Sequence, residues 1–288
     1  MEIVQVNQAE MLQAINRSEV DMQISTAKAY PRDVQAAVKR IKELATLDRE
    51  TAEDCFYVLR RNGAAGQTTI EGLSVRMAEI IAGAWGNLRV QARIIGNDGK
   101  TITAQAVCHD LETNFAVSVE VKRRITDKQG RTYSEDMQVV TGNAACAIAF
   151  RNAVLKVVPK AVTKKAINEV KQVALGKALD VETSRQNCIA NFAKIGVTTE
   201  MLCQYLDIKS AEEIGKEQIF ELRATWNAIK EGTTSGQETF VQPQEEKRIA
   251  EKAKSKAQAA KERAQQAIAR QKQNNATDND LQLTADVP

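Results

Sequence analysis

The chain has 288 residues, of which 43% are hydrophobic and only 4% aromatic, and its net charge is +3. This length allows one large domain or two small ones, with a core built mainly from Ala, Val, Ile and Leu. A net charge this small excludes any argument for nucleic-acid binding from the total alone, so such an argument depends on where the charges lie.

The cysteines predict a reducing compartment. They are odd in number, widely spaced and without a CxxC pair, at Cys55, Cys108, Cys146, Cys188 and Cys203. That pattern is typical of reduced thiols. The N-terminus has no cationic segment followed by an apolar run, and no apolar stretch is long enough to span a bilayer. We therefore expect a cytoplasmic protein without membrane contact.

The first third of the chain predicts helices. Residues 31–47 begin with Pro31, which suits a first helical turn, and continue with apolar residues at helical spacing. Residues 69–86 show the same spacing and stop at Gly86. Residues 55–63 fit either the end of a helical region or a short strand, and the order of residues 1–30 stays open.

The hydrophobic period then changes to two. Residues 87–95, 101–110 and 115–125 alternate apolar and polar positions, as half-buried strands do. Asp98-Gly99 separates the first two runs, and this pair is a strong hairpin signal because a tight turn needs positive φ. We therefore predict an antiparallel meander with one apolar face.

The rest of the chain predicts helices and a tail. Residues 142–160 are apolar around most of the circumference and end at Pro159, which indicates a core helix. The predicted segments that follow are a helix over 162–176, a small helical domain over 177–232, a linker over 233–244, a solvated helix over 245–273 and a disordered acidic end over 274–288. The predicted fold class is α+β, a three- to four-stranded antiparallel meander packed against helices within residues 31–176.

Familiar catalytic motifs do not fit this sequence. One histidine, His109, and scattered cysteines make neither a typical zinc site nor a catalytic triad. The stretch NDGKT over 97–101 has Ile94 where a phosphate-binding loop needs glycine, and it lies between two predicted strands. We expect no nucleotide hydrolysis and no cofactor.

One enzymatic alternative remains. Asp110 at a strand end, followed by Glu120 and Lys122 on one face of the next strand, is the arrangement with which many nucleases hold Mg²⁺ and a catalytic lysine. The E-x-K spacing is also common on any solvated strand, so this site competes with a simple polar face.

Positive charge is concentrated after the third predicted strand. Between Lys122 and Lys171 there are eleven Lys or Arg and four Asp or Glu, a local excess of +7 that exceeds the +3 of the whole chain. Such a concentration neutralises phosphates and releases counterions. Trp85 and Tyr133 lie near these cations in sequence and suit base stacking, but for Trp85 we favour a place in the core beneath the sheet.

The order of a helix, three strands, a basic turn and a long helix is similar to that of known annealing proteins. The run TIEGLSVRMAEIIAGAWGNLRVQARII, followed by TAQAVCHDLETNFAVSVEVKRRITDKQGRTYSEDMQVVTGNAACAIAFRNAVLKVVPKA, resembles phage and prophage recombination proteins. These resemble in turn the single-strand annealing superfamily of RecT, Redβ, Erf and the eukaryotic Rad-type proteins. The resemblance covers about residues 20–175.

The resemblance implies annealing of complementary DNA strands without ATP or metal, by rings or filaments of identical subunits in a bacterial cytoplasm. It also implies a C-terminal region that contacts a phage exonuclease or a host single-strand binding protein. The DNA groove would use Arg89, Arg93, Lys122, Arg123, Arg124, Lys128, Arg131, Tyr133, Arg151, Lys156 and Lys160. The competing hypotheses are the Mg²⁺-dependent nuclease and a non-enzymatic phage scaffold or adaptor that assembles through its Ala/Lys/Glu-rich tail.

Overall fold

A computed structural model of the chain describes residues 8–63, 66–127, 129–176 and 181–241. Residues 1–236 form one compact unit, and residues 237–288 form a second. Of the second unit, the structure describes one helical turn over Gln237–Val241. The predicted solvated helix and acidic end, residues 245–288, lie outside the described residues.

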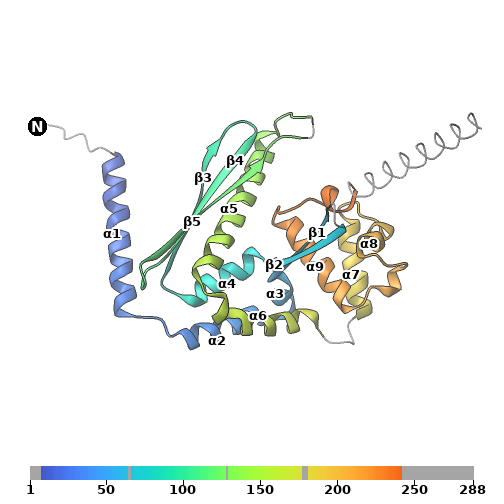
Figure 1. Ribbon diagram of the computed structural model, residues 1–288, viewed down its shortest axis with the longest axis horizontal. Coiled ribbons are helices and arrows are strands. Elements are labelled where there is room, and N and C mark those ends of the chain that lie inside the picture. The colour runs from blue at the N-terminus through green and yellow to red at the C-terminus, as the bar shows by residue number, and fades with distance from the viewer. Residues whose placement is uncertain (1–7, 64–65, 128, 177–180, 242–288) are drawn as a thin grey trace, which may run out of the picture. The chain divides into compact units, whose positions relative to one another are not determined.

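The first unit mixes helices with two small antiparallel sheets (Figure 1). Its helices are α1 (Gln8–Ala29), α2 (Val34–Ala45), α3 (Arg49–Asp54), α4 (Val75–Trp85), α5 (Glu135–Val157), α6 (Lys160–Leu175), α7 (Val181–Ala193), α8 (Thr199–Leu206) and α9 (Lys216–Lys230), with a 3-10 turn at Ala211–Glu213. Its strands are β1 (Phe56–Gly63), β2 (Gly66–Leu73), β3 (Leu88–Asn97), β4 (Thr101–Asp110) and β5 (Phe115–Arg124). Across the described ranges, no helix is long and apolar enough to cross a membrane.

The predicted meander is present as the sheet β3-β4-β5. All its pairs are antiparallel, and the predicted strand over 101–110 matches β4 residue for residue. The hairpin also forms where Asp98-Gly99 predicted it, because Gly99 has φ +78° and the Asp98 carboxylate accepts hydrogen bonds from the backbone N–H of Lys100 and Thr101. The alternation of polar and apolar residues was therefore a sound guide to strand position.

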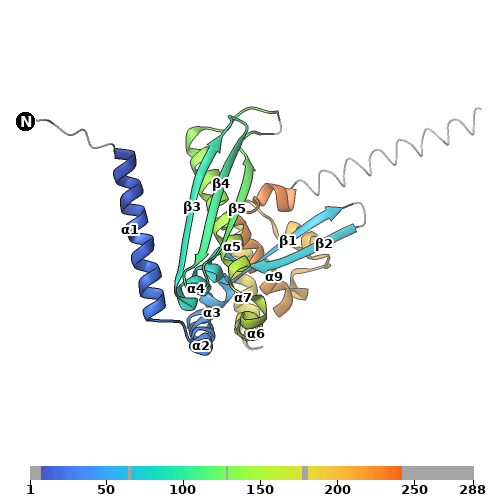
Figure 2. The ribbon, with the colours of Figure 1, turned by 60° about the vertical axis from the view of Figure 1, so that its left-hand side comes forward.

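Helix α5 lies across one face of this sheet in both views (Figures 1 and 2). The sheet presents small and medium apolar residues there, and Ala104, Ala106 and Cys108 of β4 are fully buried. The face of α5 that packs against them carries Ala145, Ala149 and Ala153 at four-residue spacing, and these are also fully buried. Small side chains let the helix approach the strands closely, so this inner face forms the core. The α+β fold with a β-β-β-α core is confirmed.

The second sheet, β1-β2, differs from the prediction. Residues 69–73, predicted as the start of a helix, belong to strand β2, and the helix α4 begins only at Val75 after the N-cap Ser74. The Ser74 hydroxyl accepts a hydrogen bond from the backbone N–H of Met77. This cap stops the helix from extending backwards, and pairing with β1 takes up the preceding residues.

Helices α7 to α9 belong to the same compact unit as the meander. Phe220 and Ala224 of α9 are buried in the core cluster that also contains Phe56 of β1. The Asn227 amide donates to the backbone oxygens of Glu53 and Phe56, at 3.0 and 3.1 Å. The helical region predicted over 177–232 is thus joined to the core by side chains of one face of α9.

Candidate nucleic-acid interface

The outer face of the β3-β4-β5 sheet, opposite α5, gathers four of the nominated cations. Pairing registers place Arg93 beside Gln105, Lys122 beside Thr103 and Arg124 beside Thr101, and Glu120 lies on the other side of Gln105 from Arg93. Side chains alternate between faces along a strand, so Arg89, Arg93, Lys122 and Arg124 share this outer face. With Glu120 as the acid on the same face, the four cations leave an excess of three positive charges.

Most of this outer face is open to solvent. Residues 91–100 of β3 and its turn are all exposed, and so are Ser118, Glu120, Lys122 and Arg124 of β5. Arg89 differs from the rest, because its side chain is only 16% exposed and lies 3.0 Å from Gln23 and 3.9 Å from Glu19, both on α1. Arg93, Lys122 and Arg124 are therefore the cations best able to reach a ligand.

The basic turn after β5 folds back on the β3–β4 hairpin. The Thr132 hydroxyl donates to the Gly99 backbone oxygen at 2.9 Å, and Thr126 pairs with Thr132 across the turn. Arg131 is exposed and pairs with Asp127 at 2.7 Å. Hydrogen bonds from the backbone and side chain of Arg131 lower the pKa of Asp127. The turn thus adds Arg131 and the half-buried Tyr133 near the hairpin end of the sheet, while Lys128 lies outside the described residues.

Arg123 points to the other side of the sheet. It alternates with Lys122 and Arg124, pairs with Ile102, and donates hydrogen bonds to the backbone oxygens of Gly232 and Thr233. These carbonyls follow the C-terminal end of α9, where backbone oxygens lack helical partners. The structure therefore separates Arg123 from the outer-face cations and gives it a place in the fold.

Arg151 is also separated from the surface. It is 5% exposed and lies 4.5 Å above the ring of Tyr57, and its Nη1 is 3.7 Å from the Glu231 carboxylate. A guanidinium buried between an aromatic ring and a carboxylate stabilises packing and is not accessible to a polynucleotide.

Lys156 and Lys160 are exposed, but Lys156 lies in the last turn of α5 and Lys160 begins α6. The first turns of α5 lie beside the hairpin end of the sheet, where the Asn97 amide donates to Gln138 at 3.1 Å. A 23-residue helix is about 35 Å long, so its last turn is far from the hairpin. These two lysines therefore do not join the Lys122–Arg124 group.

The proposed nuclease residues do not converge. Glu120 and Lys122 lie on the outer face, whereas Asp110 lies on the inner face, where Arg32 binds it with contacts of 2.6 and 3.0 Å. Burial raises the pKa of Asp110, but hydrogen bonds from Arg32 and from the Thr113 and Glu112 backbone lower it more, and the net pKa is below the usual value. No group of three potential metal ligands is present in the part of the chain that the structure describes.

Four of the five cysteines are buried, and Cys146 is half-buried. All five are free, and burial raises the pKa of Cys55 and Cys188 to about 12 and that of Cys108 to about 11. A thiol must ionise to react, so these three side chains are unreactive near neutral pH.

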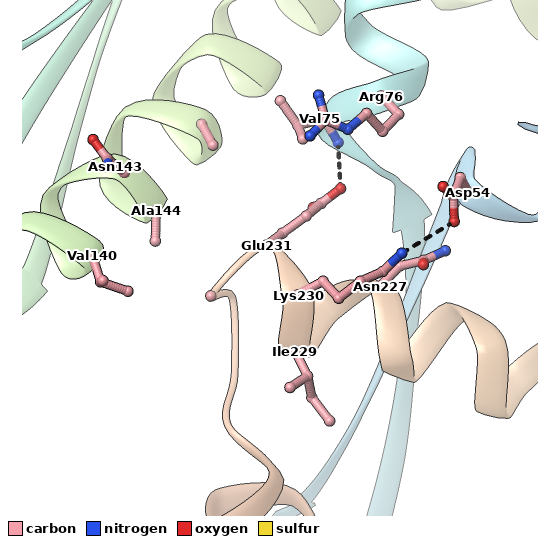
Figure 3. Close-up of a pocket in the computed structure, with 12 residues that line it drawn as sticks. Asp54, Val75, Arg76, Val140, Asn143, Ala144, Asn227, Ile229, Lys230 and Glu231 are labelled. Atoms are coloured by element: carbon pink, nitrogen blue, oxygen red, sulfur yellow. Dashed lines mark hydrogen bonds and ion pairs between the residues drawn. The ribbon is translucent and has the colours of Figure 1, made fainter. Parts of the chain in front are cut away.

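A pocket of about 390 Å³ opens between α3, α4, α5 and α9 (Figure 3). Glu231 crosses from the end of α9 and accepts a hydrogen bond from the Val75 backbone N–H at 3.0 Å, while Lys230 pairs with Asp54 at 3.6 Å. None of the nominated DNA-binding residues lines this pocket. Arg76 pairs with Glu79 and Glu231 lies 3.7 Å from Arg151, so each charged side chain of the lining already has a partner within the protein.

The sequence prediction missed some polar residues of the outer face. Thr103 and Gln105 of β4 lie between the two rows of cations, and Lys100 is exposed in the hairpin turn. The alternation that located the strands assigns Thr103 and Gln105 to this face, so the signal for them was present. Comparison of the chain with protein-family models, with curated proteins and with solved structures finds no match.

Proposed function

We propose that this protein binds single-stranded DNA on the outer face of the β3-β4-β5 sheet and anneals complementary strands without ATP. The observation that supports the proposal is the set of exposed cations on one polar face, Arg93 on β3 and Lys122 and Arg124 on β5, which outnumber the acids Glu120 on the same face and Asp98 in the adjoining turn. An exposed polar sheet face with spaced cations suits the regular charge of a sugar-phosphate backbone.

The size of this face fits a short length of strand. Ten-residue strands extend about 33 Å, and stacked DNA rises about 3.4 Å per nucleotide on each strand. One copy of the sheet therefore spans on the order of ten nucleotides. Cations bind the phosphates, while Thr103 and Gln105 offer hydrogen bonds between the rows, and the bases stay available for pairing.

Annealing makes and breaks no covalent bond, so its physical needs are modest. It needs neutralised phosphates, so that two strands approach each other, and enough copies in register to hold a long stretch. We propose a homo-oligomer, a ring or filament, for the second need. A contact of the C-terminal region with an exonuclease or a single-strand binding protein belongs to the same proposal.

The test is an annealing assay with fluorescent complementary oligonucleotides, in EDTA and without ATP. We expect the wild-type chain to accelerate pairing and the double variant Lys122→Glu/Arg124→Glu to lose most of the acceleration. The matched control is Lys194→Glu/Lys209→Glu, which makes the same charge change at exposed positions around α7 and α8. Equal annealing by the two double variants would refute the assignment of the face.

The same assay separates the competing hypotheses. Strand cleavage that appears on adding Mg²⁺ and disappears in Glu120→Ala would favour the nuclease. No DNA affinity at low salt would leave the scaffold or adaptor role.

A further inference from the structure

A second pocket, of about 240 Å³, opens at the end of the sheet away from the hairpin, where β3 begins. Its walls come from α2, from the last turn of α4 and from the segment before α2. Tyr30, Arg40, Gly83 and Trp85 are among the residues that line it. Asn87 also lines it and directly precedes β3, so the pocket lies at the end of the sheet where β3 begins, two residues before Arg89.

The walls of this pocket hold hydrogen-bonding capacity that the protein does not use. Arg40 is exposed, and the described residues offer it no hydrogen-bond or ion-pair partner. Trp85 is 5% exposed, and its indole N–H finds no acceptor among the residues that the structure describes. Helix α4 ends at Trp85, and the last turn of a helix leaves backbone carbonyls without helical donors. The residues that line the pocket therefore include unused donors, and they belong in part to the C-terminal end of α4.

An aromatic ring stands at the rim. Tyr30 is 76% exposed, and its backbone oxygen accepts a hydrogen bond from the Asn87 amide at 2.9 Å. This bond fixes the residue while it leaves the ring free. Exposed rings of this kind stack nucleobases at little cost in sequence preference.

Arg32 and Trp85 form one wall of the pocket, and both make close contacts there. Arg32 binds Asp110 through two nitrogens and lies 4.8 Å above the Trp85 ring. The Nη2 atom of Arg32 also donates a hydrogen bond to the Gly86 backbone oxygen at 3.2 Å. A wall built from a bidentate ion pair and a stacked indole keeps its shape when a ligand enters.

We infer that this pocket receives one unstacked nucleobase from the strand on the outer face, an inference that rests on the proposed function for the source of the base. Pockets for drug-sized ligands measure about 300–1,000 Å³, so a smaller pocket suits a single ring system. Tyr30 stacks on the base, Arg40 donates to its carbonyl or ring nitrogen, and the α4 carbonyls accept from an exocyclic amine. The ligand class is a planar heterocycle with both donors and acceptors.

Gly83 supplies a steric test. It lies in the last turns of α4, and a Cβ built on it meets no atom within 4 Å, so a side chain there enters open space. Gly83→Leu should fill the pocket, and Gly83→Ala is the matched control with the same helical backbone. Thermal denaturation checks that both variants fold like the wild-type chain.

The measurement uses a series of oligonucleotides of twelve nucleotides, each with a single 2-aminopurine at a different position. We expect one position to resist quenching by acrylamide in the wild type and in Gly83→Ala, and to lose that protection in Gly83→Leu and Tyr30→Ala. Gly83→Leu should weaken binding of the intact strand on the order of tenfold, the equivalent of one lost base stack, but should not weaken binding when that position is abasic.

Equal protection and equal affinity in Gly83→Leu and Gly83→Ala would overturn the inference. If the wild-type chain binds no oligonucleotide, the proposed function fails, and free deoxynucleoside monophosphates then test the pocket by Trp fluorescence. Binding that Gly83→Leu abolishes would assign the pocket to free nucleotides. An absence of binding would reject the pocket as a base site.

Discussion

The buried ion pair between Arg32 and Asp110 decides the role of a residue that the sequence offered as a metal ligand. The two side chains are 9% and 7% exposed, and Arg32 also pairs with Glu112 at 3.1 Å. A carboxylate that two guanidinium nitrogens bind in a desolvated setting is already neutralised. Asp110 thus ties the segment before α2 to the end of β4.

Asp110→Asn should lower the free energy of unfolding by about 3 kcal/mol at pH 7, because it leaves Arg32 with one carboxylate in place of two. The folded pKa of Asp110 lies below its usual value, so its contribution is present above the ordinary pKa near 3.9 and is lost as pH falls through the folded pKa. Urea denaturation should show a constant gap between wild type and variant from pH 7 to 5 that narrows below about pH 4. A gap independent of pH would contradict this assignment.

Neighbouring arginines and lysines should separate into two classes on substitution. Arg123→Ala removes the donor of the Gly232 and Thr233 carbonyls, which should cost roughly 1–3 kcal/mol of stability and leave DNA affinity unchanged. Lys122→Ala should weaken DNA binding and leave the melting temperature unchanged, since Lys122 is exposed. Thermal denaturation and fluorescence anisotropy on both variants test the contrast, and a shared response would show that the two faces do not differ in role.

For the helices and strands, the sequence predicted correctly those positions that depend on neighbouring residues in the chain. The strands β3 to β5 followed from alternation, their hairpin from Asp98-Gly99, and the end of α5 at Val157 from Pro159. The start of α5 was predicted seven residues too late. Its N-cap, Ser134, is followed by two acids that favour the first turn, so the signal was present in the sequence.

Other features depend on tertiary contacts and had no local signal. Residues 66–73 become strand β2 because β1 pairs with them along its whole length, although their apolar residues also fit a helix. The inward place of Arg123 follows from alternation, but its carbonyl partners come from 109 residues further along the chain. Alternation was thus enough to predict the candidate face and the separation of Arg123 from it, whereas the carbonyl partners of Arg123 and the burial of Arg151 were not predictable.

Glu231, which links the end of α9 to the start of α4, should change stability with pH in the opposite direction to Asp110. Burial raises the pKa of Glu231, and the Val75 N–H and Arg151 lower it less. A carboxyl with a raised folded pKa stabilises most at low pH, and its contribution falls as pH rises through the folded pKa. Glu231→Gln keeps an acceptor for Val75, so the stability of the wild type relative to this variant should decline from about pH 4 upward. Denaturant titrations across pH test it, and a rising difference would contradict the raised pKa.

Across the first unit, the cations divide into those that are exposed on the outer face and those that bind partners inside the protein. The net charge of +3 does not reveal that three accessible cations lie together on the outer face. Other arginines bind carboxylates or carbonyls within the first unit, namely Arg32, Arg60, Arg123 and Arg151. The same residue type therefore serves the fold and the proposed surface, and position on the sheet decides which. Sequence counts cannot make that distinction, because they treat all cations alike.

Salt dependence should report the number of cations that meet phosphates. Binding to single strands loses affinity with a slope of about −0.7 in log K against log salt for each neutralised phosphate. Contacts from Arg93, Lys122 and Arg124 thus predict a slope of about −2 per copy, and each alanine substitution among them should reduce its magnitude by about 0.7 whatever the DNA sequence. Arg123→Ala should leave the slope unchanged because Arg123 lies on the inner face. Anisotropy titrations on short oligonucleotides over a range of salt concentrations measure these slopes, and a wild-type slope near zero would mean that the outer face does not contact phosphates.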